Sequence, residues 1–255
     1  MATVATVDRL ALARRVIAAL DLTELGDDAD AERIEAVCRA AHTAHGDVAA
    51  VCIPPRHVAL ARRVLAGHGR TAIRVATVAN FPEGDGPVAD CVREVRIAVA
   101  EGADEVDVVF PWRALRAGNE RLGHELVAAC RAACGTARLK VILETGALHS
   151  HCLIRRASEV ALAAGADFLK TSTGRIAAGA SLDAAAVMLE VLAEHHADAG
   201  LKVSGGLRTL IQASAYLDLV DRRMGSDWAR PERFRIGASR LLDEALATLG
   251  GPGAA

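Results

Sequence analysis

The sequence contains few aromatic residues, and this shortage limits the partners that the protein can have. Aromatic side chains make up 3% of the 255 residues, which argues against a surface that stacks nucleic-acid bases. The formal net charge of -2 gives no reason to expect attraction to nucleic acid or to an anionic membrane. We therefore expect neither a nucleic acid nor a membrane as a partner.

Long apolar runs and closely paired cysteines are also missing. No apolar run is long enough to span a bilayer, and the first 20 residues carry Asp8, Arg9, Arg14 and Arg15 where a secretory signal would have an uninterrupted apolar core. The six cysteines form no Cys-x-x-Cys pair, so they do not suggest a disulfide framework. We expect a cytoplasmic protein.

Lysine is the scarcest charged residue. Of the 30 lysines and arginines, 27 are arginines, and Lys140, Lys170 and Lys202 each follow a leucine inside a strand-like segment. One interpretation is an accident of composition, with lysines on edge strands, where they are common. We favour a functional interpretation, because arginine can replace lysine as a surface charge but cannot form an imine.

Lys170 is placed at the junction of a buried strand and a polar loop. Residues 167–170 are mostly apolar, and Thr171-Ser172-Thr173-Gly174 is small, polar and flexible. Lysine is rarely buried without a partner, and loss of hydration lowers the pKa of its amine. A neutral amine at this position is what a Schiff-base nucleophile requires.

Short strand-like runs alternate with amphipathic helical stretches along the whole chain. The expected strands are 16–21, 48–53, 72–78, 105–110, 138–144, 168–171, 201–204 and 234–236, and the expected helices are 29–45, 56–67, 88–101, 121–134, 152–164, 182–196, 209–219 and 239–249. Eight repeats without a linker predict a single-domain (β/α)8 TIM barrel over residues 1–255, with a disordered tail at 250–255. A doubly wound sheet is the alternative, but no G-x-G-x-x-G follows the first strand.

Active sites of such barrels lie at the carboxyl ends of the strands. Asp107 lies inside an apolar strand, with Glu105 on the same face by the two-residue period. A buried carboxylate needs a partner, and a lysine would keep it ionised. Lys202 beside Lys170 would lower the pKa of Lys170 through repulsion between like charges.

Three further polar residues lie near the ends of expected strands. Asp21 either caps a turn or belongs to the site, and we weigh the two about equally. Cys52 fits a small packing residue better than a nucleophile, because no histidine is an obvious base for it. Glu144 ends the fifth expected strand, where it is placed to orient a neighbouring residue from the loop.

The last two strands are followed by loops suited to phosphate. Gly205-Gly206 follows the seventh strand, and Gly237-Ala238-Ser239 follows the eighth and opens a helix. In barrels these two loops commonly bind phosphate through backbone N–H groups and a helix N-terminus. Gly174 and Arg175, after the sixth strand, supply a third side.

Several segments, in order from Asp21 to about Leu242, resemble deoxyribose-phosphate aldolase. They are Asp21-Leu22-Thr23, Asp104 to Pro111, Leu139 to Thr145, Asp167 to Gly174, Lys202 to Gly206 and Arg235 to Ser239. The resemblance implies a class I aldolase that needs no metal or cofactor and forms a homodimer. It implies reversible cleavage of a small-molecule sugar phosphate, 2-deoxy-D-ribose 5-phosphate, into acetaldehyde and D-glyceraldehyde 3-phosphate.

The resemblance also assigns roles to individual residues. It makes Lys170 the imine-forming lysine, Lys202 its neighbour in the proton relay, and Asp107 the acid/base residue, with Lys140 close by. It gives the phosphate group to Gly174, Arg175, Gly205, Gly206 and Ser239, and we expect Asp21, Cys52 and Thr171 to complete the substrate site. Arg175, Val203 and Arg240 depart from the family's common pattern. Another lysine-dependent barrel aldolase, or a non-catalytic sugar-phosphate-binding barrel, remains as an alternative function.

Overall fold

In the computed structural model, which describes residues 4–195 and 198–250, parallel strands close into a barrel. Within those ranges the strand order around the barrel is β1-β10-β9-β8-β7-β6-β5-β4. The strands are β1 (Leu20–Thr23), β4 (Ala50–Cys52), β5 (Arg74–Ala79), β6 (Glu105–Val109), β7 (Arg138–Ile142), β8 (Phe168–Lys170), β9 (Gly200–Ser204) and β10 (Phe234–Ala238). The predicted eight-stranded TIM barrel is confirmed, and the doubly wound sheet is excluded.

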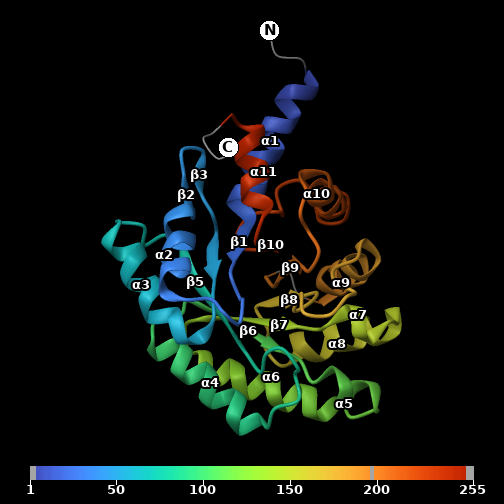
Figure 1. Ribbon diagram of the computed structural model, residues 1–255. Coiled ribbons are helices and arrows are strands. Elements are labelled where there is room, and N and C mark those ends of the chain that lie inside the picture. The colour runs from blue at the N-terminus through green and yellow to red at the C-terminus, as the bar shows by residue number, and fades with distance from the viewer. Residues whose placement is uncertain (1–3, 196–197, 251–255) are drawn as a thin grey trace.

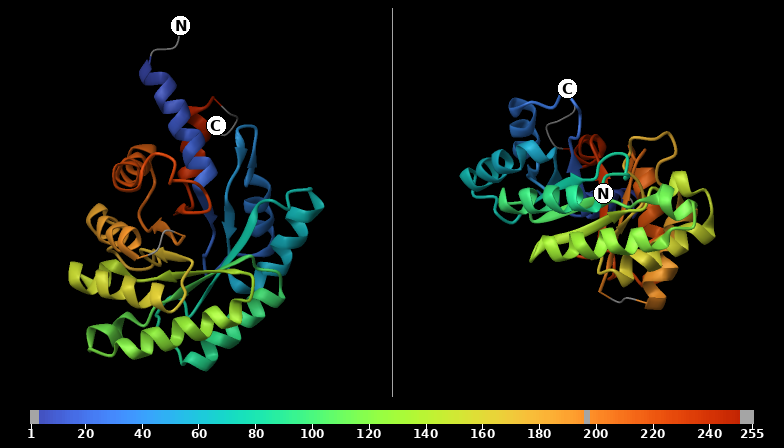
Figure 2. Two further views of the ribbon diagram at one scale, coloured as in Figure 1. Left: turned by 180° about the vertical axis from the view of Figure 1, so that it is seen from behind. Right: turned by 90° about the horizontal axis from the view of Figure 1, so that it is seen from below.

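Helices surround the strands and cover the outside of the barrel, as the views in Figures 1 and 2 show. The longer ones are α1 (Val4–Ala19), α2 (Ala31–Ala40), α3 (Val58–Gly67), α4 (Val88–Ala100), α6 (Glu120–Cys134), α8 (His151–Ala163), α9 (Leu182–His195), α10 (Leu210–Met224) and α11 (Leu241–Thr248). The short ones are η1 (Pro55–His57), α5 (Trp112–Arg116) and α7 (Thr145–Leu148). Neighbouring helices pack side by side over most of the outside, as α4 with α6 and α8 with α9 do, and the first helix, α1, lies against the last, α11.

The helices bury one face each because their apolar residues recur at helical spacing. In α4, for example, Cys91, Val95 and Ala98 are buried against the barrel. Their beginnings follow local chemistry as well: Thr209 and Gln212 form a capping box at the start of α10. None of the helices in the described ranges is both long and apolar enough to cross a membrane.

The repeated Gly-Ala-Asp segments make the same turn twice. Gly102 and Gly165 end α4 and α8 with φ of +100° and +95°, a conformation that favours glycine. The aspartate of each segment then bonds to the preceding strand of the barrel. Asp104 accepts a hydrogen bond from the N–H of Val75 at 2.8 Å, and Asp167 accepts one from the N–H of Leu139 at 2.7 Å. Each carboxylate is also contacted by an arginine of an earlier helix, Arg62 in α3 and Arg131 in α6.

The predictions for the first repeat need correction. Residues 16–19 were expected to begin the first strand, but they complete α1, and β1 starts at Leu20. The helix predicted over 29–45 ends at Ala40, because a hairpin of β2 (His42–Thr43) and β3 (Gly46–Asp47) follows. Gly46 turns this hairpin with φ of +119°.

The end of the fifth repeat and the tail also differ from the sequence predictions. The strand predicted over 138–144 stops at Ile142, and Glu144, with φ of +56°, introduces the short helix α7. Of the tail predicted to be disordered, Gly250 is described and lies in a turn. Residues 251–255 lie outside the described part of the chain, as does residue 196 of the predicted helix 182–196.

The inside of the barrel has an apolar side and a charged side. On β4 and β5, Ala50, Cys52, Ala76 and Val78 form a small buried apolar cluster. The other strands point charged side chains inward, and these are almost completely buried: Asp21, Glu105, Asp107, Lys140, Lys170, Lys202 and Arg235. Such a set persists only when its charges are paired.

Candidate active site

The three lysines of the chain lie on three neighbouring strands and meet inside the barrel. Lys140 is on β7, Lys170 ends β8 and Lys202 is on β9, with Lys170 and Lys202 in register. Their side chains are 0%, 3% and 1% exposed. A closed barrel has no edge strand, so the edge-strand interpretation of these lysines is wrong.

Asp107 on β6 is the point at which the three ammonium groups converge. Its Oδ1 accepts a hydrogen bond from Lys140 at 2.7 Å, and its Oδ2 accepts from both Lys170 and Lys202 at 2.8 Å. Burial would raise the pKa of Asp107, but the three cations outweigh it, and the pKa lies well below its ordinary value. Asp107 is therefore a carboxylate at any physiological pH.

Further carboxylates distinguish Lys140 and Lys202 from Lys170. Glu105 lies 2.6 Å from the amine of Lys140, and Asp21 lies 2.5 Å from that of Lys202. Burial alone would lower the pKa of both lysines. Each lysine has two close carboxylates, however, and these raise its pKa above the ordinary value. Lys140 and Lys202 therefore stay protonated.

Lys170 has no second carboxylate within salt-bridge distance in the described ranges. Burial lowers the pKa of Lys170, the Asp107 carboxylate offsets part of this effect, and the Lys202 ammonium lowers the pKa again. The pKa of Lys170 therefore lies below the ordinary value of 10.5. Among the three lysines, Lys170 is the one that releases its proton most readily.

Arg235 on β10 belongs to the same set of charges, although no role was predicted for it from the sequence. Its Nη1 donates to Asp21 at 2.6 Å and to Glu105 at 3.1 Å, and its Nη2 donates to Glu105 at 2.8 Å. The available signal was a charged residue between Phe234 and Ile236 in an apolar strand. That signal was obscured because arginine is so frequent in this chain.

Asp21, Cys52 and Thr171 are fully buried and do not line the pocket that opens at the carboxyl ends of the strands. Asp21 is fully buried between Lys202 and Arg235, so it is part of the charged set and not a turn cap. Cys52 packs in the apolar cluster, where burial raises the pKa of its thiol. The hydroxyl of Thr171 donates to the carbonyl of Ser204 and accepts from its N–H, which joins β8 to β9.

A pocket of about 590 Å³ opens at the carboxyl ends of the strands. Lys170 and Lys202 form its buried wall, and neither Asp107 nor Lys140 reaches it. The rim comes from the loops after β1, β8, β9 and β10. The lining residues there include those predicted to hold a phosphate group: Gly174, Arg175, Gly205, Gly206 and Ser239.

The loop after β8 is fixed from two sides. Glu144 accepts hydrogen bonds from the hydroxyl of Thr173 at 2.5 Å and from its N–H at 3.3 Å, so Glu144 does orient a neighbour, as expected. The guanidinium of Arg175 donates to the carbonyl of Leu25 and to Asp27, which ties this loop to the one after β1. The side chain of Arg175 remains about one-third exposed at the pocket.

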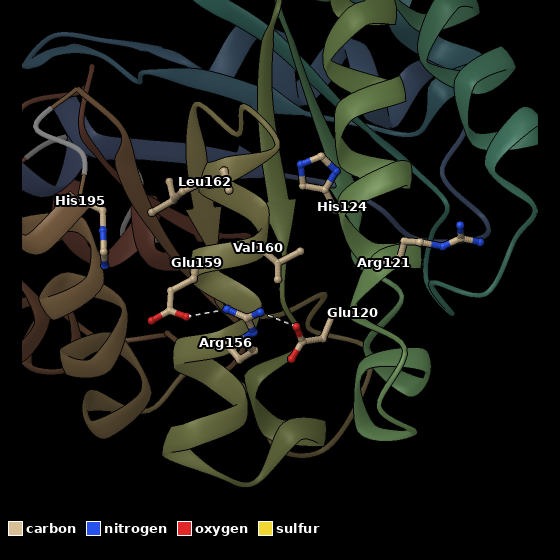
Figure 3. A pocket seen from close by; sticks show the side chains of 9 residues that line it. Glu120, Arg121, His124, Arg156, Glu159, Val160, Leu162 and His195 are labelled. Atoms are coloured by element: carbon tan, nitrogen blue, oxygen red, sulfur yellow. Dashed lines mark hydrogen bonds and ion pairs between the residues drawn. The ribbon is translucent and has the colours of Figure 1, made fainter.

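A second pocket, of about 680 Å³, lies on the outside of the barrel between α6, α8 and the end of α9. Figure 3 shows Arg156 on its surface, paired with Glu120 and Glu159. The three lysines lie inside the barrel and do not line this pocket. The barrel mouth is therefore the candidate active site.

Comparison with known sequences and structures fits this geometry. The sequence pattern of the family described as DeoC/LacD family aldolase matches residues 15–242. The chain belongs to this family. Membership makes it an aldolase-type enzyme, a carbon–carbon lyase.

Solved structures of similar proteins agree over almost the whole chain. A Toxoplasma gondii protein, provisionally named a deoxyribose-phosphate aldolase, is 27% identical with a TM-score of 0.89, covering 96% of this chain and 98% of its own. A Coccidioides immitis protein with the same provisional name is 30% identical with a TM-score of 0.80, covering 91% and 86%. A tetrameric deoxyribose phosphate aldolase from Aeropyrum pernix, 23% identical with a TM-score of 0.76 and covering 96% and 94%, shares the fold.

Proposed function

We propose that the protein is a class I aldolase that reversibly cleaves 2-deoxy-D-ribose 5-phosphate into acetaldehyde and D-glyceraldehyde 3-phosphate. The observation that carries the proposal is the unequal pairing of the buried lysines: Lys140 and Lys202 each have two close carboxylates, whereas Lys170 shares a single oxygen with Lys202. Lys170 also lines the pocket. A deprotonated amine facing a substrate pocket is suited to imine formation.

In the proposed reaction, the Nζ of Lys170 adds to the C1 aldehyde of the open-chain sugar phosphate, and water leaves to give a protonated imine. A base then takes the proton of the C3 hydroxyl. The electron pair of the C2–C3 bond moves into the imine, and glyceraldehyde 3-phosphate departs. Protonation of the enamine at C2 and hydrolysis of the imine release acetaldehyde and restore the amine.

Asp107 is the proposed acid/base residue of these proton transfers. Its carboxylate is fully buried beneath Lys170 and Lys202 and does not line the pocket. We therefore assign the contact with substrate to a water molecule or to the Lys202 ammonium, with Asp107 as their hydrogen-bond acceptor. General acid/base catalysis of this kind typically contributes about 10²–10⁴ in rate.

The phosphate end of the substrate fits the loops after β8, β9 and β10. Gly205 and Gly206 both have positive φ, at +93° and +88°, and bring bare backbone to the pocket. Arg175 adds a cation to the rim. The provisional names of the Toxoplasma gondii and Coccidioides immitis relatives support a sugar phosphate of this kind as substrate.

Borohydride trapping with 2-deoxy-D-ribose 5-phosphate tests the proposal. We expect a stable mass gain on the peptide that contains Lys170 and none in the Lys170→Arg variant, which should keep its circular dichroism spectrum and lose turnover. Only three lysines can carry the label, so its position is easily assigned. Labelling of Lys140 or Lys202 instead, or full activity of Lys170→Arg, would contradict the assignment.

The product assay separates this function from its rivals. Another lysine-dependent aldolase would form an imine with a different substrate and release no acetaldehyde from this one. A binding barrel without activity would bind the sugar phosphate and never be trapped. The proposal also includes a homodimer and a cytoplasmic location, which light scattering and cell fractionation would test.

A further inference from the structure

The charges inside the barrel do not balance when every lysine is protonated. Four cations and three carboxylates form one continuous set of buried ion pairs: Lys140, Lys170, Lys202 and Arg235 with Asp21, Glu105 and Asp107. Fully charged, this set carries one excess positive charge. An uncompensated charge is costly in such a buried place, so loss of a single proton stabilises the set.

The geometry determines which group loses that proton. Arg235 cannot release one, because a guanidinium stays protonated in proteins. Lys140 and Lys202 each lie within 2.8 Å of two carboxylates. Lys170 has a single acceptor, whose Oδ2 it shares with Lys202. The excess charge is therefore relieved at Lys170.

Arg235 holds the two carboxylates on which this difference depends. Its guanidinium bridges Asp21 and Glu105, the second partners of Lys202 and Lys140, and its Nε donates to the carbonyl of Pro231. Arg235 is 3% exposed and forms no part of the pocket lining. It therefore does not touch a substrate in the pocket, and it reaches Lys170 through the charged set and through the Phe168 ring, over which its guanidinium lies at 5.8 Å.

We propose that Arg235 is a positioning residue that keeps Lys170 uncharged by supplying the fourth cation of the buried set. The inference rests on the proposed role of Lys170 as the imine-forming amine. Lys170 is also faced by the Cys52 thiol from β4 and by the Glu144 carboxyl after β7. Burial raises the pKa of the Cys52 thiol, which favours its neutral form. The Glu144 carboxyl accepts hydrogen bonds from Thr173 and makes no ion pair with Lys170 in the described ranges, so it lies outside the set of direct ion pairs.

The direction in which each substitution should move the pKa of Lys170 follows from the same count of buried charges. With Arg235→Met, the set is neutral only when Lys170 is protonated, so the pKa of Lys170 should rise by about one unit or more. The neutral amine at pH 7 would then fall at least about tenfold. With Glu105→Gln the pKa should fall, because an anion is lost. The double variant Arg235→Met/Glu105→Gln removes one charge of each sign and should return the pKa toward that of the wild type.

Lysine scarcity makes a direct measurement possible. Protein labelled with ε-¹³C-lysine should give three side-chain signals, from Lys140, Lys170 and Lys202, each assignable by a Lys→Arg variant. The pH titration of the Lys170 signal needs no substrate. In parallel, the rise of kcat/KM with pH should move to higher pH in Arg235→Met, and Arg235→Lys, which keeps the cation, should move it less.

Arg138→Met is the matched control. The guanidinium of Arg138 stacks over the Phe168 ring at 5.7 Å, much as that of Arg235 does at 5.8 Å, but it contacts none of the three carboxylates. It should leave the Lys170 titration unchanged. If Arg235→Met only lowers stability and the Lys170 titration stays in place, or if the double variant titrates like Arg235→Met, the proposal is wrong. Should Arg235→Met fail to fold, the Lys170 titration in Glu105→Gln and in the double variant still tests the proposal.

The two proposals fail in different experiments. Absence of borohydride labelling in the wild type would refute the imine chemistry, whatever pKa values the lysines have. Labelling of Lys170 together with an unchanged titration in Arg235→Met would refute the role of Arg235 and leave the aldolase proposal intact.

Discussion

Gly237 makes room for Lys202, although it forms no bond to the charged set. A Cβ at this position would lie 3.0 Å from Cε of Lys202 and 2.9 Å from Cβ of Ser204. Both contacts are tighter than ordinary packing allows, so a methyl group must displace the ammonium from Asp107 or move the strand. The backbone at Gly237 thus helps to set the position of the ammonium group next to Lys170.

We predict that Gly237→Ala lowers kcat about 10- to 100-fold, because small displacements of catalytic groups are costly, and destabilises the fold by about 1–3 kcal/mol. Steady-state kinetics and urea unfolding would measure the two effects. Gly67→Ala is the control, because a Cβ there meets nothing within 4 Å at the end of α3. Unchanged kinetics in Gly237→Ala would show that the Lys202 side chain tolerates the methyl group.

Arg175 supports a prediction about the phosphate group. Its guanidinium already bonds to Leu25 and Asp27, so it is held at the pocket rim before substrate arrives. Loss of a charge-assisted hydrogen bond of about 1.5–3 kcal/mol should raise KM for 2-deoxy-D-ribose 5-phosphate about 10- to 100-fold in Arg175→Met. KM for unphosphorylated 2-deoxy-D-ribose should change little, and Arg175→Lys should be intermediate. An equal loss with both sugars would exclude a phosphate contact.

For single residues, the sequence identified the lysines and Asp107 as one of their partners, but not the individual pairings. Lys140, Lys170 and Lys202 were recognisable because lysine is otherwise absent, and Asp107 because a carboxylate interrupts an apolar strand. Which carboxylate serves which lysine depends on the strand register and on side-chain reach, and neither is encoded locally. Arg235 went unassigned both because its partners are distant in sequence and because arginine is so frequent in this chain.

The segment Glu144-Thr145 shows how one element positions another. Glu144 follows β7, yet its carboxylate bonds to Thr173 after β8, three residues beyond Lys170. This contact orients the loop that carries Gly174 and Arg175 to the pocket. The end of β8 is therefore defined by a neighbouring strand's loop as well as by its own sequence.

A double-mutant cycle would measure this contact. Glu144→Ala leaves the buried N–H and hydroxyl of Thr173 without their acceptor, so we expect a loss of about 1–3 kcal/mol in the free energy of unfolding. Thr173→Val removes the hydroxyl alone. The two losses should be less than additive in the double variant if the side chains interact. Strict additivity would mean that the bond contributes nothing to stability.

Errors in the predicted elements have identifiable physical causes. The run Val16-Ile17-Ala18-Ala19-Leu20 is apolar throughout, so periodicity cannot separate the end of a helix from the start of a strand. The hairpin after α2 is two residues per strand, too short to interrupt a helical pattern visibly. Its signal was Gly46, a turn residue that a continuous helix to His45 left unexplained.

The whole molecule was easier to predict than its parts. Eight repeats of one pattern specify a closed barrel even when single boundaries are wrong, because every strand needs two neighbours and closure supplies them. Closure then brings residues as distant in sequence as Asp21 and Arg235 into contact. The charged interior is thus a property of the assembled barrel.

This interior should control the stability of the molecule in acid. The pKa values of Asp21 and Asp107 lie below the ordinary 3.8, and that of Glu105 lies below 4.5, because the buried cations outweigh the effect of burial. As pH falls below about 4.5, the unfolded chain therefore binds protons that the folded chain does not. The stabilisation is complete above that pH and is lost as pH falls through the folded-state values.

We predict that the free energy of unfolding falls below about pH 4.5 with a slope of up to about 4 kcal/mol per pH unit, because three carboxyl groups contribute about 1.4 each. Urea unfolding between pH 7 and pH 3 would measure it. Exposed pairs such as Arg155–Glu194 and Arg156–Glu120 also lose charge in acid, but about 1 M salt screens such surface pairs. A slope that persists in high salt arises from the barrel interior, and a slope that salt abolishes would assign the acid sensitivity to the surface.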